Sequence, residues 1–343
     1  MSTSSELFSK MQVDASLDVG LLVCCGGFET RALTIAKRMH GCDARANGAV
    51  VLHYESQRAD NEGNYEKLVT MMKSVSPGQV DTVDVNASFP LVSYERIRAR
   101  IMHASRAWGN RRVTVDISGM THLWALGVIH ACVLEGLEVD VAYTEARGYF
   151  PKHRDAEPLR RAWQERDYTE ASQSLQSAAL MAIHILPDFA GNFRPGHPTC
   201  LIVFAGYEPN RLEGLIDSYA PGALVVLYGK SPRPAHQWRT KLSKALHAKM
   251  FSEWPLREDE CSTLSPEEAL GKLEEIAAVV GSKYDVAVAP HCSKMQGVAS
   301  YVFWRRHPET QLIFTSPVRF SPQQYSICER EVYVYRLSAA LRP

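Results

Sequence analysis

Two stretches of the same build, residues 113–125 and 285–297, constrain the fold of this chain more than any other feature. Each begins as a short apolar strand (VTVDI and DVAVA), continues through a turn of small polar residues and returns at once to a helical pattern. This sequence of elements is typical of α/β proteins, which bind ligands beyond the carboxyl ends of their parallel strands. The two turns are therefore the first candidates for a ligand site.

The patterns around these two stretches recur in the same order, roughly 175 residues apart. GGFETRAL in the first half matches AGYEPNRL in the second, and AVVLHY matches ALVVLY. The repeat predicts an α/β protein with two tandem Rossmann-like domains, mostly parallel sheets and an origin by internal duplication. The alternative is two independent α/β runs that look alike because all such runs do.

The predicted boundaries follow from composition. Continuous apolar runs at 19–25 and 199–205 each open one half, as strands buried on both faces do. Charged and small polar residues predominate between the halves, and the alternating stretch 331–337 reads as a final strand. We predict domain 1 at 17–150, a connecting segment at 151–198 and domain 2 at 199–343.

The composition excludes several classes of partner. Lysine plus arginine and aspartate plus glutamate both number 38, so no overall field favours extended nucleic acid or an anionic membrane. The 8 cysteines lie mostly in apolar runs without a Cys-x-x-Cys pair, which is typical of reduced thiols and gives no metal site. No signal peptide and no membrane-spanning run is evident. We expect a cytoplasmic protein without membrane contact, metal or cofactor.

The two turns carry hydroxyl groups and a basic side chain where a helix begins. Such a position suits phosphate, because the helix dipole and the first backbone N–H groups favour an anion there. N-capping alone would explain the hydroxyl residues, but it does not require His122 or Lys294. The predicted contacts in the turns are Ser118, Gly119, Thr121, His122, Ser293 and Lys294.

A second pair of matched loops follows the first strand of each half. An arginine there could form a fork onto phosphate, or it could pair with the glutamate beside it and orient the loop. The aromatic residue could stack on a base or cover the sheet. The predicted ligand contacts in these loops are Gly27, Phe28, Glu29 and Arg31 in the first half and Gly206, Tyr207 and Arg211 in the second, where Glu208 matches Glu29.

Asp116 is a third kind of candidate. A carboxylate at the end of a buried strand costs free energy unless it is paired, bound to metal or catalytic. Its counterpart is Val288, so a catalytic Asp116 would make the halves unequal. Cys292 beside His291 could be a nucleophile, but no acid partner is evident. The chain has neither a G-x-x-x-x-G-K-[ST] nor a G-x-G-x-x-G motif at the first strand, which disfavours the usual NTP and dinucleotide sites.

The turns SGMTHLWAL and HCSKMQGVA resemble the TGGTK-type strand-turn-helix of CRISPR-associated Rossmann-fold (CARF) sensor domains. AGYEPNRLEGLIDSYAPGALVVLYG also resembles their opening β-α-β unit. Thr121-His122 and Ser293-Lys294 stand where that family has threonine-lysine, and Met120 stands in place of a glycine. The resemblance implies a two-domain pseudo-dimer with a shared cleft that binds a cyclic oligonucleotide or a related second messenger, and a role in antiviral defence.

Two functions follow from that resemblance. The chain could sense the nucleotide and signal to a separate effector protein, or it could cleave the ligand as a ring nuclease, with His122 as base and Lys294 stabilising charge. One rival is an enzyme acting on a small nucleoside or sugar phosphate through Asp116, and another is an adaptor subunit of a defence complex. Each function is compatible with a homo-oligomer.

Overall fold

The computed structural model describes residues 8–11, 19–76, 78–109, 111–172, 174–177, 179–251, 256–337 and 341. The chain divides into two compact units. Unit 1 consists of Met1–Tyr149 together with Ser326–Pro343, and unit 2 is Phe150–Tyr325.

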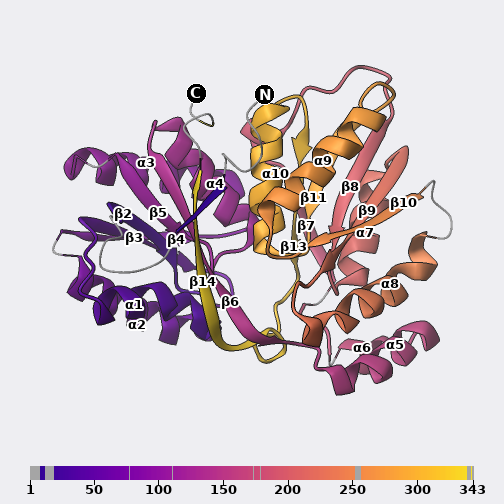
Figure 1. The fold of residues 1–343 in the computed structure, drawn as a ribbon, viewed down its shortest axis with the longest axis horizontal. Helices are drawn as coiled ribbons and strands as arrows, with labels where there is room; N and C mark the ends of the chain where they lie inside the picture. Colours follow the sequence, from indigo (N-terminus) through magenta and orange to yellow (C-terminus); the bar gives the residue numbers. More distant parts are fainter. Residues whose placement is uncertain are drawn as a thin grey trace. The chain divides into compact units, whose positions relative to one another are not determined.

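Unit 1 is built on a seven-stranded sheet in the order β1-β14-β6-β5-β2-β3-β4 (Figure 1). The five strands from β6 to β4 are parallel, whereas β14 is antiparallel to β6 and to β1. The strands are β1 (Phe8–Met11), β2 (Leu21–Cys25), β3 (Gly48–Tyr54), β4 (Val80–Val85), β5 (Arg112–Asp116), β6 (Glu138–Tyr149) and β14 (Ser326–Leu337). The helices are η2 (Thr30–Leu33), α1 (Thr34–Gly41), α2 (Arg58–Val75), α3 (Pro90–Ala107) and α4 (His122–Leu134).

Helices cover both faces of this sheet. Apolar side chains of α1 and α2 form one cluster with β2 and β3, including Met39, Leu68, Leu22 and Val51. α3 and α4 lie on the other side of the strands (Figure 1). Burial on two faces explains why every residue of β2 is apolar and buried, and why α4 is buried continuously over residues 123–133.

Unit 2 is built on a five-stranded parallel sheet in the order β10-β9-β8-β11-β12, beside a two-stranded antiparallel ribbon of β7 and β13. The strands are β7 (Leu180–His184), β8 (Thr199–Ala205), β9 (Ala223–Lys230), β10 (Leu256–Ser262), β11 (Asp285–Pro290), β12 (Gln311–Leu312) and β13 (Phe314–Pro317). The helices are α5 (Ala156–Glu165), α6 (Tyr168–Ser172), α7 (Pro209–Tyr219), α8 (Trp238–Phe251), α9 (Pro266–Val280) and α10 (Lys294–Arg306), with 3-10 turns η3 (His153–Asp155), η4 (Pro187–Phe189), η5 (Pro234–His236) and η6 (Pro322–Gln324).

The parallel strands of the two units have the same order. When the parallel strands of each unit are numbered in chain order, their order across the sheet is 3-2-1-4-5 in both units. The chain order therefore reverses between β2 and β5 in unit 1 and between β8 and β11 in unit 2. The predicted α/β class with mostly parallel sheets is confirmed, and the origin by internal duplication stays a prediction.

The division of the chain differs from the predicted one at both ends of the second half. β14 pairs with β6 in unit 1, so the domain predicted at 199–343 loses its last strand to the other unit. The segment 151–198, predicted as a connection, contributes α5, α6 and β7 to unit 2. The reason is that β6 needs a partner on its open edge, and an antiparallel strand can arrive there from any distance along the chain.

Candidate functional site

The loops after β2 and β5 meet at the point where the strand order of unit 1 reverses. A Cβ added to Gly27 would lie 2.7 Å from the carbonyl oxygen of Gly119, and one added to Gly119 would lie 2.4 Å from that of Cys25. Unit 2 has the same contact, since a Cβ on Gly206 would lie 3.0 Å from the carbonyl oxygen of His291. The structure therefore brings together the two loops that the sequence marked in each half.

Gly119→Ala is expected to lower the free energy of unfolding by about 1–3 kcal/mol, because the added methyl group would push two backbone segments apart. Urea unfolding of the two proteins measures the difference. The control is Gly63→Ala in α2, where no atom lies within 4 Å of the added Cβ. That change should raise the free energy of unfolding by up to about 1 kcal/mol through helix propensity. An unchanged Gly119→Ala protein would show that the two loops are not in contact.

Tyr54, the last residue of β3, holds the first turn in place. Its hydroxyl donates to the carbonyl oxygen of Gly119 at 3.2 Å and accepts from the backbone N–H of Thr121 at 2.9 Å. Burial raises the pKa of Tyr54 well above its ordinary value, so the hydroxyl stays protonated. Tyr54 is not among the site residues predicted from the sequence, although its place at the end of a central strand was a signal.

Asp116 and Ser118 are both buried and serve the same turn. Asp116 Oδ1 accepts from the backbone N–H of Ser118 at 2.9 Å, and Ser118 Oγ accepts from the backbone N–H of Thr144 on β6 at 2.9 Å. Both side chains therefore join β5 to its turn and to the neighbouring strand. These contacts give the Asp116 carboxylate a structural partner in its own turn, and a catalytic role for it stays a prediction.

The two helix starts differ in their capping. In unit 2, Ser293 Oγ accepts from the backbone N–H of Gln296 at 3.2 Å, and Gln296 Oε1 accepts from that of Ser293 at 3.0 Å, which is a capping box. In unit 1, Thr121 occupies the N-cap position of α4 but makes no capping hydrogen bond with its side chain. Thr121 and His122 are half-buried, as is Lys294 in the first turn of α10. Ser293 thus has the capping role that was the alternative to ligand contact.

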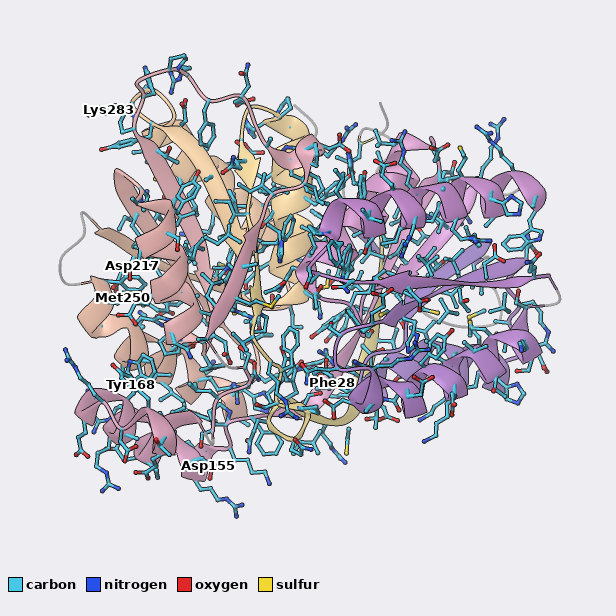
Figure 2. The ribbon with its side chains drawn as sticks, turned by 180° about the vertical axis from the view of Figure 1, so that it is seen from behind. Phe28, Asp155, Tyr168, Asp217, Met250 and Lys283 are labelled. Atoms are coloured by element: carbon cyan, nitrogen blue, oxygen red, sulfur yellow. The ribbon has the colours of Figure 1, made fainter. Side chains whose placement is uncertain are left out.

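Glu29 and Arg31 form the local pair that was one of the two predicted alternatives. Arg31 Nε and Nη2 donate to the two carboxylate oxygens of Glu29 at 2.9 and 2.8 Å. Arg31 Nη1 donates to Tyr143 Oη at 3.1 Å and to the carbonyl oxygen of Thr144 at 3.0 Å. Glu29 also accepts from the hydroxyl of Ser326 on β14. The pair therefore fastens the β2 loop to β6 and β14, while Phe28 beside it is half-buried (labelled in Figure 2).

The matched loop of unit 2 is held differently. Glu208 accepts from the backbone N–H of Gln176 at 2.9 Å and from the Ser177 hydroxyl, and burial raises its pKa although Arg211 acts in the opposite direction. No hydrogen bond joins the side chains of Glu208 and Arg211 among the residues described. The equivalence predicted for the two glutamate-arginine pairs thus does not extend to their contacts.

Arg239 of α8 is a further residue of this edge, and it is not among the site residues predicted from the sequence. Its guanidinium carbon lies 4.4 Å from the ring centre of Tyr207, and its Nη atoms donate to the carbonyl oxygens of Phe150 and Pro151 at 2.7 and 2.9 Å. Burial raises the pKa of Tyr207 to about 12 and that of Cys292 to about 12, with Arg239 lowering both. Such a Cys292 is a thiol at neutral pH, so the arrangement does not favour a nucleophile.

Neither a cluster of metal-ligating side chains nor a membrane-spanning helix is found among the residues that the structure describes. No group of three or more histidine, cysteine, aspartate or glutamate side chains in those parts of the chain could hold a metal ion. None of the helices described there has the length and apolar content needed to cross a bilayer.

Comparison with known proteins identifies no family. No family model and no curated protein matches the chain. Similar solved structures include a dehydrogenase/reductase from Sinorhizobium meliloti 1021 (10% identity, 88% of this chain and 96% of that chain, TM-score 0.22). Others are the cytoplasmic domain of a prokaryotic cation chloride cotransporter (6%, 90% and 99%, TM-score 0.26) and a hydroxysteroid dehydrogenase from Escherichia coli (11%, 86% and 95%, TM-score 0.19). TM-scores this low carry no argument about function.

Proposed function

We propose that this protein binds a nucleotide second messenger at the carboxyl edge of its parallel sheets and acts as its sensor. The observation that carries the proposal is the meeting of the two predicted loops at the reversal of strand order in unit 1, with Gly27 against Gly119 and α4 starting beside them. In open α/β sheets, ligands bind in the crevice at this point.

The start of α4 supports phosphate as the group that is bound there. Its N-cap residue Thr121 leaves the capping position without a side-chain hydrogen bond, and His122 lies half-buried in the first turn. The N-terminal end of a helix attracts an anion, and a protonated histidine would add a full positive charge. A phosphate oxygen is therefore the ligand group that this turn would favour.

The chemical class of the nucleotide is proposed from the resemblance to CARF domains. This resemblance goes beyond phosphate binding. It favours a cyclic oligonucleotide and a role in antiviral defence, with a separate effector protein receiving the signal. Cleavage of the ligand by a ring nuclease activity, with His122 as base, is the alternative at the unit 1 site. The rival enzyme acting through Asp116 gains no support, because Asp116 is 2% exposed and its carboxylate accepts from its own turn.

The proposal is tested by calorimetric titration of the full chain with cyclic oligoadenylates, followed by chromatography of the nucleotide. We expect saturable binding that His122→Glu weakens at least about tenfold, because a carboxylate would face the phosphate. The control is His40→Glu at the exposed end of α1, which makes the same charge change and should leave the affinity unchanged. Recovery of intact ligand supports a sensor, and linear products support a ring nuclease. No binding, or equal losses in both variants, would refute the proposal.

A further inference from the structure

The start of α3 exposes apolar side chains at the carboxyl edge of the unit 1 sheet. Phe89, the N-cap residue of α3, is 64% exposed, which is the highest value of any large apolar side chain among the residues described. Leu91 and Val92 follow it and are also exposed. An exposed aromatic side chain beside further apolar side chains marks a contact with a ligand or a partner. The start of α3 is therefore a candidate for such a contact.

The loop that carries Phe89 is fixed by hydrogen bonds. The backbone N–H of Phe89 donates to the carbonyl oxygen of Asn86 at 3.1 Å, and Asn86 Oδ1 accepts from the backbone N–H of Ser88 at 2.9 Å. The backbone N–H of Asn86 donates to Ser93 Oγ at 3.0 Å, which joins the loop to α3. Because this backbone is already held, a ligand that covers the ring orders little additional chain, which lowers the entropic cost of binding.

This loop lies at the same edge as the proposed nucleotide site. Val85, the last residue of β4, pairs directly with Tyr54 at the end of β3. Tyr54 in turn bonds to Gly119 and Thr121 in the turn before α4. β4 lies two strands beyond β2, which is roughly 10 Å at the usual spacing of neighbouring strands. A ligand made of linked nucleotides is long enough to extend from the start of α4 to this loop.

The surroundings of the ring suit a neutral group. Glu55, which follows β3, accepts from Asn86 Nδ2 at 2.9 Å and lies 4.0 Å from Arg96 of α3, so the charges of this pair balance. The positive end of the α3 dipole also lies here, but Pro90 offers no N–H group and the neighbouring side chains are apolar. A planar base fits such a surface better than a second phosphate, which would lose its hydration against apolar groups.

We propose that the ring of Phe89 stacks on a base of the nucleotide whose phosphate binds at the start of α4. Every base has a π-face, and stacking on an aromatic side chain holds a base without hydrogen bonds to its edges. Phe89 thus fixes where the base lies, while His122 acts on the phosphate. The inference rests on the proposed function, and it assigns the base contact to Phe89 rather than to Phe28, which is half-buried.

The test is calorimetric titration of the full chain and of three Phe89 variants with cyclic oligoadenylates. Phe89→Ala should weaken binding by about fivefold or more, because a stack of a base on an aromatic ring contributes on that scale. Phe89→Leu keeps an apolar side chain without the ring and should weaken binding nearly as much, whereas Phe89→Trp should keep or raise the affinity. Since the side chain is largely exposed, the unfolding midpoint in urea should be unchanged in all three variants, which separates a loss of binding from a loss of folding.

The matched control is Tyr168→Ala, which removes an aromatic side chain that is 55% exposed on α6 of unit 2 and should leave the affinity unchanged. Phe89→Trp adds a second readout, since stacking on adenine should quench the fluorescence of the new tryptophan. An affinity of Phe89→Leu equal to that of the parent chain would overturn stacking. Binding that His122→Glu weakens but Phe89→Ala does not would overturn this inference alone, whereas a parent chain that does not bind would refute the proposed function as well.

Discussion

Replacing Arg31 by methionine is expected to lower the free energy of unfolding by about 3–5 kcal/mol. The Arg31 side chain is 6% exposed and the Glu29 side chain 8%, so the pair is shielded from water. Without the guanidinium, the Glu29 carboxylate would stay buried without its cation, and the Tyr143 hydroxyl and the Thr144 carbonyl oxygen would each lose a donor. Such a loss is larger than the contribution of the pair itself, because desolvation of the remaining charge is uncompensated.

Urea unfolding followed by circular dichroism measures this effect. The double variant Glu29→Gln/Arg31→Met should lose clearly less than Arg31→Met alone, since it leaves no buried charge. The control is Arg160→Met, which removes an arginine from the exposed pair with Glu157 and should not change the unfolding midpoint. If Arg31→Met unfolds like the parent chain, the pair does not fasten the β2 loop.

Much of the fold could be predicted because buried parallel strands have a simple signature. The strand predicted at 199–205 has the bounds of β8. Continuous apolar runs mark such strands, since helices cover them on both faces. The order of strands and helices in each half could be predicted for the same reason.

For two strands, β10 and β14, this apolar signature is not sufficient. β10 has the sequence LREDECS and pairs only with β9 in its sheet, so its outer side needs charges that discourage further pairing. This charged stretch therefore lacks the apolar pattern that predicts a buried strand. β14 was placed in the second half because nothing local in a strand indicates which distant edge it will join, and its partner β6 lies about 190 residues earlier.

The candidate site, like the fold, could be predicted only in part from the sequence. Sequence patterns identified the loops that meet at the reversal of strand order, because their position follows from topology. They could not indicate that Tyr54 would bond to Gly119 and Thr121, or that Arg239 would lie over Tyr207. These contacts depend on distances between separate strands and helices, which side-chain types alone do not determine.

Acidification is expected to destabilise unit 2 through His247 of α8. This imidazole is fully buried, its Nδ1 lies 2.8 Å from the carbonyl oxygen of Ser243, and its ring stacks on Phe251. Burial lowers the pKa of His247 from about 6.5 to about 4, although the contact with the Ser243 carbonyl acts in the opposite direction. Above pH 6.5 both folded and unfolded chains hold a neutral imidazole, so this stability is fully present there.

As the pH falls from 6.5 towards 4, the unfolded chain takes up the proton first, and the folded state loses about 3 kcal/mol. Unfolding free energies of the parent chain and of His247→Gln between pH 7.5 and 4 measure this loss. Glutamine cannot titrate but can still donate to the Ser243 carbonyl, so the difference between the two curves isolates His247. His184, whose pKa burial also lowers, is present in both proteins and cancels. Parallel curves would mean that the imidazole is accessible to protons in the folded chain.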